Sequence, residues 1–267
     1  MSATDTSEEG VMRTLRLLWV GWVMNLKMLT RSAFNFWLGI VYPLFFATAA
    51  FFMFQSGDDP KPLLYASLGA AVMGIWGATS TAAGNALSQQ RWHGTLELLV
   101  TAPAHFALLL LPMTIAMATI GIYSMISTLV WGRLVFGIEL EVGDPLAFAL
   151  AVPATVVSIG ALGFLLAVAF VRFRQAWALG NMLEYPVWLV SGFLVPLTLF
   201  PDWVRPISWA LAPTWGVSAI RGAALGGAPY GDIALALALG GGYTLAGILL
   251  LERALRAARA KATLSLS

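Results

Sequence analysis

Residues 146–171 read LAFALAVPATVVSIGALGFLLAVAFV, without one charged side chain. About 20 consecutive apolar residues are enough for a helix to cross the hydrocarbon core of a bilayer. A charged side chain at the centre of that core is costly, so its absence over such a length is the pattern of a transmembrane helix. This segment therefore predicts that the chain is a membrane protein.

The rest of the chain contains further runs of this kind. The 267 residues are 59% hydrophobic and only 10% charged, whereas soluble domains have about 25% charged residues. We expect an all-α membrane protein with six transmembrane helices in a single domain, residues 1–267. The predicted spans are 34–54, 63–88, 106–131, 146–171, 176–195 and 232–251.

The basic residues set the expected orientation. With six spans, both ends of the chain lie on one side, and of the 15 Lys and Arg residues only Lys61, Arg133, Arg205 and Arg221 lie on the other. Because Lys and Arg accumulate on the cytoplasmic side, we expect a multi-pass cell-membrane protein with both termini and the loop 89–105 in the cytoplasm. A five-span or seven-span layout would place the basic C-terminal tail on the opposite side of the membrane from the N-terminal helix.

Two segments outside the spans have patterns of their own. In residues 10–31, apolar side chains such as Trp22 share one helical face and Arg16 lies towards the other, which predicts an amphipathic helix at the membrane interface. A solvated cytosolic helix is the alternative. Residues 196–231 are largely apolar but are interrupted by prolines and glycines, so we expect a re-entrant extracellular helical hairpin before the last span.

The cytoplasmic loop 89–105 carries the most informative motif. A polar stretch meets Gly94, a short amphipathic helix is expected to begin near Thr95, and Pro103 helps to end it. A compact helix that projects into the cytosol is suited to docking in a groove of a partner protein. Its apolar anchors would be Leu96, Leu99 and Val100, and its oriented charges would be Arg91 and Glu97.

The run RWHGTLELLVTAP, residues 91–103, resembles the cytoplasmic signature of type-2 ABC exporter permeases. A Gly-Thr-Leu-Glu core, a Leu pair and a Thr-Pro-like ending carry the likeness, although Ala102 intervenes before the proline and Gln90 stands where an acidic residue is usual. The segment SGFLVPLTLFPDWVRPISWALAPTWGVSAIR, residues 191–221, is similar to the re-entrant hairpin of that family. With the N-terminal helix and the six-span layout, the resemblance covers nearly the whole chain.

The resemblance implies a permease that dimerises with a second copy or a homologue and binds two ATP-binding cassette ATPase subunits through the cytoplasmic loop. It would move an amphipathic, lipid-like, drug-like or glycan substrate out of the cytoplasm. The residues that would contact the ATPase are Arg91, Gly94, Thr95, Leu96, Glu97, Leu98, Leu99 and Pro103.

The sequence has no phosphate-binding loop. Such a loop needs Gly-Lys followed by Ser or Thr, and the three lysines follow other residues: Lys27 follows Leu26, Lys61 follows Pro60 and Lys261 follows Ala260. We therefore expect no enzyme activity and no cofactor in this chain, with ATP and Mg²⁺ bound by the partner ATPase. The basic residues are spread along the membrane flanks, so no nucleic-acid partner is expected.

Glu184 is the one charged residue in the interior of a predicted span, since Asp232 is the first residue of the last span. It should face the bundle interior or a cavity, either as a contact with substrate or a gate, or as a structural hydrogen-bonding group near Pro186. Most tryptophans of this chain fit an interfacial belt, which is expected of any membrane protein. Trp37, Trp76 and Trp188 lie within spans and are candidates for lining a substrate path.

Arg172 and Arg174 lie between the fourth and fifth spans. They are either topogenic charges or contacts with the ATPase or with anionic lipid. His93 and His105 flank the predicted cytoplasmic helix but have no carboxylate or Cys at the spacing of metal ligands, so no metal site is expected.

Three other functions compete with ATP-driven export. A secondary transporter or channel acting without an ATPase would normally have several ionisable residues within its spans, and only Glu184 lies in the interior of one. An intramembrane enzyme acting on lipid would need a nucleophile with a base, or a metal, and neither histidine lies near a membrane-embedded Ser or Asp. A structural assembly factor would not need the loop motif.

Overall fold

The computed structural model describes residues 3–31, 41, 44–45, 47–49, 51–53, 61–92, 106–139, 142–170 and 176–260. Its elements in chain order are α1 (Ala3–Thr30), α3 (Lys61–Trp92), α5 (Ala107–Phe136), α6 (Pro145–Phe170), α7 (Ala176–Val190), η1 (Leu197–Leu199), α8 (Val204–Trp209), α9 (Ala212–Leu225) and α10 (Pro229–Ala260). No strand occurs among the described residues, which confirms the predicted all-α class.

Four of these helices are long and apolar enough to cross a membrane: Pro62–Thr81 within α3, Ala107–Phe136, Pro145–Phe170, and Pro229–Ala254 within α10. They coincide with the second, third, fourth and sixth predicted spans. Helix α7 lies within the fifth predicted span, and the first, 34–54, is described only at scattered helical positions from 41 to 53. The count of six spans therefore stays a prediction.

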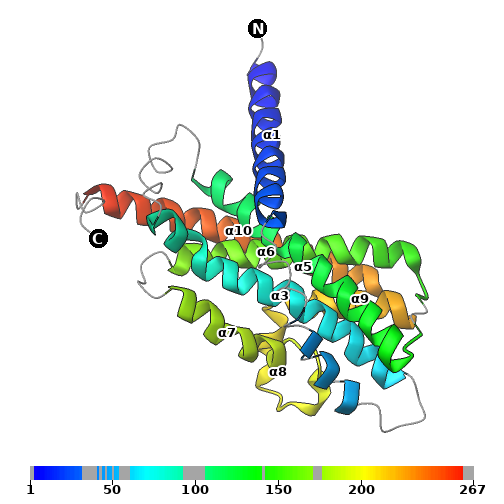
Figure 1. The fold of residues 1–267 in the computed structure, drawn as a ribbon. Coiled ribbons are helices and arrows are strands. Elements are labelled where there is room, and N and C mark those ends of the chain that lie inside the picture. The colour runs from blue at the N-terminus through cyan, green and yellow to red at the C-terminus, as the bar shows by residue number, and fades with distance from the viewer. Residues whose placement is uncertain are drawn as a thin grey trace.

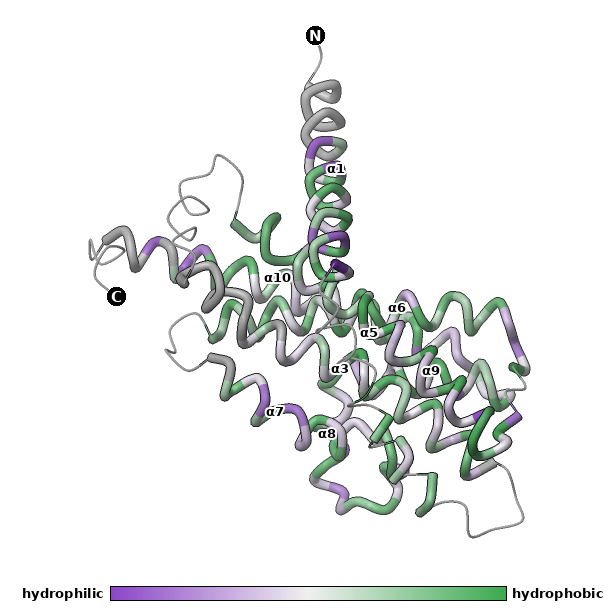
Figure 2. Tube along the Cα trace, viewed as in Figure 1, coloured by the Kyte–Doolittle hydropathy of each residue, from purple (hydrophilic) through white to green (hydrophobic). Residues whose placement is uncertain are grey.

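Helix α3 lies, together with α6, at the centre of the bundle. It packs against α5, α6, α7 and α9, and 78% of its most apolar stretch is buried, compared with 17% for α10. The side chains of Leu68, Val72, Ile75 and Trp76 are almost completely buried and form the middle of the largest hydrophobic cluster. In Figure 1, α3 runs alongside α5, α6 and α7, all of which it contacts, and much of α5 and α6 is coloured as apolar in Figure 2.

These helices approach one another most closely at glycine positions. A Cβ atom placed on Gly160 of α6 would lie 2.8 Å from Cα of Ile115 in α5, and one on Gly216 of α9 would lie 2.6 Å from the Thr155 side chain of α6. In a bilayer, lipid is as apolar as a leucine side chain, so helices associate through close packing at small residues. The spacing of glycines thus explains how tightly the four spanning helices and α9 can assemble.

Helix α1 stands at a steep angle to the bundle and contacts it through α5 (Figure 1). The indole of Trp22 donates a hydrogen bond to the Thr119 hydroxyl at 3.0 Å, which fixes the second half of α1 on α5. Met12, Leu15, Trp19 and other apolar side chains are exposed, as are Arg13 and Arg16. Figure 2 shows polar and apolar residues mixed along the coloured part of α1, and the position of this helix at a membrane surface stays a prediction.

After α7 the chain breaks into short helices, as the prolines predicted. Helix α7 ends at Val190, five residues before the predicted end of the span, because Gly192 turns the backbone with a φ of 71°. Elements η1, α8 and α9 follow, and Gly226 with a φ of 84° ends α9 before α10 begins. That this segment enters the outer leaflet of the membrane stays a prediction.

The close contact at Gly160 allows a test of the packing. We expect Gly160→Ala to lower the free energy of unfolding by about 1–3 kcal/mol, because the new methyl group meets the backbone of α5 and the helices must separate. The measurement is the thermal unfolding temperature of the protein in mild detergent, which should fall by several degrees.

The matched control is Gly241→Ala, since a Cβ on Gly241 of α10 meets nothing within 4 Å. This substitution should leave the unfolding temperature unchanged or raise it slightly, because alanine favours helix more than glycine. Equal losses in the two variants would contradict the packing described for α5 and α6.

Candidate functional site

Glu184 lies at the contact between α7 and α3. Only 6% of its surface is exposed, although glutamate is rarely buried without a partner. Two glycines bring the helices together here. A Cβ on Gly180 of α7 would lie 2.5 Å from the carbonyl oxygen of Ser80, and one on Gly77 of α3 would lie 2.9 Å from Oε1 of Glu184. The carboxyl group therefore rests over the space that the missing side chain of Gly77 leaves open.

Two tryptophans predicted as path residues are buried in the same part of the bundle. Trp76 of α3 is 1% exposed and Trp188 of α7 is 7% exposed, and both belong to one hydrophobic cluster. The Trp188 ring also contacts Tyr185, with ring centroids 5.0 Å apart. The Trp76 indole N–H has no hydrogen-bond partner among the described residues. The interface of α3 and α7 thus combines a carboxyl group with large aromatic surfaces inside the bundle.

Several predicted site residues fall outside the described part of the chain. They are Trp37, Arg172, Arg174 and, in the loop 89–105, Gly94, Thr95, Leu96, Glu97, Leu98, Leu99 and Pro103. Arg91 lies in the last turn of α3, which runs to Trp92 and so extends four residues into the predicted loop. No glycine or proline precedes Gly94 within that stretch to end the helix earlier.

The described residues offer no metal site. They contain no group of three or more His, Cys, Asp or Glu side chains that could hold an ion. Glu184 therefore belongs to no such group within the described part of the chain.

Sequence reasoning missed Arg221 of α9. It was counted as one of the few basic residues on the outer side, yet only 6% of its surface is exposed. Nη1 donates a hydrogen bond to the carbonyl oxygen of Gly192 at 2.8 Å, Nε donates to that of Tyr65 at 3.2 Å, and Nη2 donates to that of Phe193. Burial lowers the pKa of Arg221 to about 10, which leaves the guanidinium protonated at neutral pH.

A signal for Arg221 existed in the sequence. It is the only charged residue in α9, whose other side chains are mainly Ala, Gly, Ile and Val. A single cation in an apolar helix indicates either a topogenic charge or a buried partner, and the choice depends on which carbonyl groups the fold brings near it.

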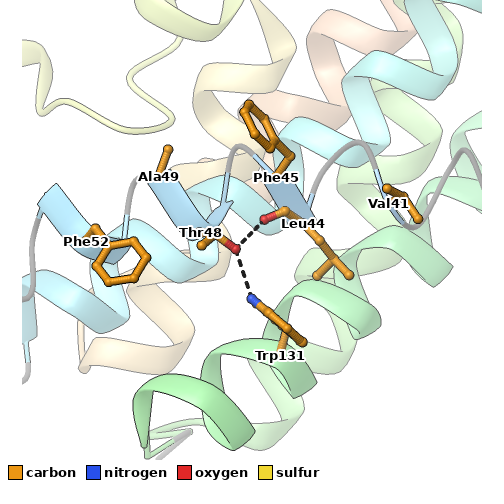
Figure 3. Close-up of a pocket in the computed structure, with 7 residues that line it drawn as sticks. All are labelled: Val41, Leu44, Phe45, Thr48, Ala49, Phe52 and Trp131. Carbon is orange, nitrogen blue, oxygen red and sulfur yellow. Dashed lines mark hydrogen bonds between the residues drawn. The ribbon is translucent and has the colours of Figure 1, made fainter.

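An apolar groove lies on another side of the bundle, with a volume of about 450 Å³ (Figure 3). It is lined by Val41, Leu44, Phe45, Thr48, Ala49 and Phe52 from the first predicted span and by Trp131 of α5. The Trp131 indole donates to the Thr48 hydroxyl at 2.9 Å, and that hydroxyl donates to the Leu44 carbonyl at 2.7 Å. Because these polar groups satisfy one another, the groove is suited only to apolar groups.

The fold is that of a helical membrane protein with several apolar helices packed around α3 and with buried charged groups at two helix contacts. Residues 16–225 match the family of ABC-2 type transporters, and the chain belongs to this family of ABC transporter permeases. The matched range includes α3, the loop 89–105 and the segment from α7 to α9. No curated protein matches the sequence.

The two glycines beside Glu184 should respond differently to alanine. Gly180→Ala is expected to lower the unfolding free energy by about 1–3 kcal/mol, because its methyl group meets the Ser80 carbonyl, a backbone atom that cannot move alone. Gly77→Ala should cost less, since it meets the end of the flexible Glu184 side chain. Thermal unfolding of both variants checks the order, and a larger loss in Gly77→Ala would contradict the placement of the carboxyl group.

Proposed function

We propose that this permease is the membrane subunit of an ATP-driven exporter whose ATPase is a separate chain. One observation carries the proposal: the family match spans the cytoplasmic loop 89–105, while no lysine of the sequence belongs to a phosphate-binding loop. A member of a transport family without a nucleotide site of its own needs an external source of energy. ABC ATPase subunits that bind ATP and Mg²⁺ are the partners that its family favours.

The arrangement of the helix ends supports the proposed orientation. In Figure 1, the end of α3, the beginning of α7 and the C-terminal end of α10 lie at one end of the bundle, here called the inner end. Arg253 and Arg256 are exposed on α10 at this end. Since basic residues favour the cytoplasmic side, the inner end is proposed to face the cytoplasm of a cell-membrane protein.

The packing of α3 supports a route for the mechanical step. The loop that would seat in the ATPase directly follows Trp92, the last residue of α3, and leads into α5. Because α3 packs on α5, α6, α7 and α9, a displacement of its inner end acts directly on these four helices. ATP binding in the ATPase dimer would shift this helix by favouring one arrangement of the bundle over another.

The substrate path is proposed to pass the α3–α7 interface. Glu184, Trp76 and Trp188 would line it or form its gate, together with Trp37 of the first predicted span. Large apolar surfaces with a single carboxyl group suit an amphipathic, lipid-like, drug-like or glycan substrate. A second permease copy would complete the path as a dimer, and Arg172 and Arg174 would contact the ATPase or anionic lipid at the inner end.

The proposed docking helix can be tested by pulling down the ATPase. With the ABC ATPases encoded nearby co-expressed, the tagged chain should bring one down in mild detergent. Leu96→Asp should weaken this binding roughly 30-fold, because an anchor in a protein groove contributes about 2 kcal/mol. The matched control is Thr101→Asp, which adds the same charge on the opposite face of the predicted helix.

Thr101→Asp should bind the ATPase as the unchanged chain does. Equal loss in both variants would mean that added charge, rather than a lost anchor, weakens the complex. If no ATPase is recovered with the unchanged chain, and proteoliposomes containing it alone move substrate along an ion gradient without ATP, the secondary transporter is favoured instead.

The orientation has its own test, because the chain contains no cysteine. We expect a membrane-impermeant maleimide to label Asp202→Cys in intact cells, since the Asp202 side chain is exposed before α8 on the proposed outer side. Thr95→Cys, in the cytoplasmic loop, should be labelled only after the cells are opened. Labelling of Thr95→Cys from outside intact cells would reverse the topology and remove the basis for ATPase docking.

A further inference from the structure

The guanidinium of Arg221 joins three segments that lie far apart in the chain. It donates to the carbonyl oxygen of Tyr65 in α3 and to those of Gly192 and Phe193, in the turn that follows α7. Its Cζ atom also lies 3.4 Å from the centre of the Tyr65 ring, a cation–π contact. We call the group of Arg221, Tyr65, Gly192 and Phe193 the Arg221 clamp.

The charge of the clamp is balanced without an acid. The ion pairs among the described residues join Arg205 to Asp202 and Arg256 to Glu252, all on the surface, and no described carboxylate bonds Arg221. Its partners are carbonyl dipoles and an aromatic face, and the carbonyl groups following α7 stand at the negative end of that helix. If one segment withdrew, a buried charge would lose its compensation, which is strongly unfavourable. The clamp therefore resists separation of its parts.

The backbone around the clamp is shaped to fit it. A Cβ atom on Gly69, one turn after Tyr65 in α3, would overlap both the Phe193 carbonyl oxygen and Nη2 of Arg221. Gly192 has a φ of 71°, a conformation that side chains other than glycine rarely adopt, and this turn presents two successive carbonyl groups to one guanidinium. Helix α3 thus lies directly against the turn, with the arginine filling the remaining space.

The position of the clamp along α3 gives it a mechanical consequence. Tyr65 and Gly69 lie near the N-terminal end of α3, whereas the opposite end at Trp92 leads into the cytoplasmic loop. A helix rises about 1.5 Å per residue, so α3 connects these two levels as one rod roughly 40 Å long. Whatever is fixed to α3 at the clamp must follow α3 when its inner end is displaced.

We propose that Arg221 is a positioning residue that makes the outer end of α3, the turn after α7 and α9 move as one body during transport. The inference rests on the proposed function only for the origin of the movement, which is the ATPase docked at the inner end. The clamp itself is a property of the permease alone.

The experiment uses the absence of cysteine in the chain. Spin labels are attached to Leu189→Cys in α7 and Leu225→Cys in α9, two exposed positions on either side of the clamp, in the full chain in lipid nanodiscs. Double electron–electron resonance should give one narrow distance distribution with Arg221 present. Arg221→Met, which keeps the side-chain volume but has no donor, should broaden it and shift it to longer distances.

Arg221→Lys serves as the conservative variant. It keeps the positive charge near Tyr65 but lacks the planar fork of donors that reaches three carbonyl groups at once, so its distribution should be intermediate in width. The control pair is Ile126→Cys in α5 with Leu150→Cys in α6, which are exposed and distant from the clamp in sequence. This pair should be unchanged in every Arg221 variant that elutes as a single species and keeps its helical circular dichroism.

The proposal would be overturned by a distribution in Arg221→Met that superimposes on that of the unchanged chain. Equal broadening of the control pair, which would indicate general loosening, would also overturn it. With the ATPase bound, addition of ATP and vanadate should leave the Leu189–Leu225 distance unchanged when Arg221 is present and alter it in Arg221→Met. A change of the Leu189–Leu225 distance with Arg221 present would also overturn it.

Failure to recover any ATPase would count against the proposed exporter. The nucleotide-free measurements would still decide the role of Arg221.

Discussion

The close approach of backbones around α3 is the constraint on which the structure depends. Lipid offers no contrast of polarity that would drive one apolar helix onto another, so association depends on how closely the helices pack. Gly69, Gly77 and the facing Gly180 leave space on or against α3, and each space is occupied by a carbonyl group, a carboxyl group or a neighbouring backbone. The arrangement of the helices is therefore determined more by the glycine positions, where side chains are absent, than by the large apolar side chains.

The same spaces hold the two buried charged groups. Glu184 rests on Gly77 partway along the α3–α7 contact, and Arg221 rests on Gly69 where that contact ends. No described hydrogen bond or ion pair joins them, and their environments differ. Arg221 has three carbonyl partners and an aromatic face, which suits a permanent structural contact, whereas Glu184 lies against a glycine and an apolar cluster, where a carboxyl group has more freedom to change partners.

The sequence predicted what depends on length and polarity alone. The uncharged runs that gave α3, α5, α6 and α10 need no neighbour to be recognised, because a bilayer requires the same length of apolar helix in any protein. The burial of Glu184 followed from the cost of a charge within a span. The burial of Arg221 did not follow, because the carbonyl groups of Gly192 and Phe193 become its partners only through a turn whose shape depends on the packing of α7 against α3.

Helices α3 and α10 differ in burial, and this difference affects how a movement would pass through the bundle. Helix α10 has few buried positions along its apolar stretch, but it packs on α6 and α9, and a Cβ on Gly240 would lie 3.1 Å from Cα of Ser158 in α6. Helix α3 is buried among four neighbours, and a packed interior does not deform continuously. A displacement of α3 must therefore carry its neighbours with it or exchange one set of contacts for another. Among the described residues no hydrogen bond or ion pair holds the contact at Glu184 and Gly77, so such an exchange costs least there, and it costs most at Arg221.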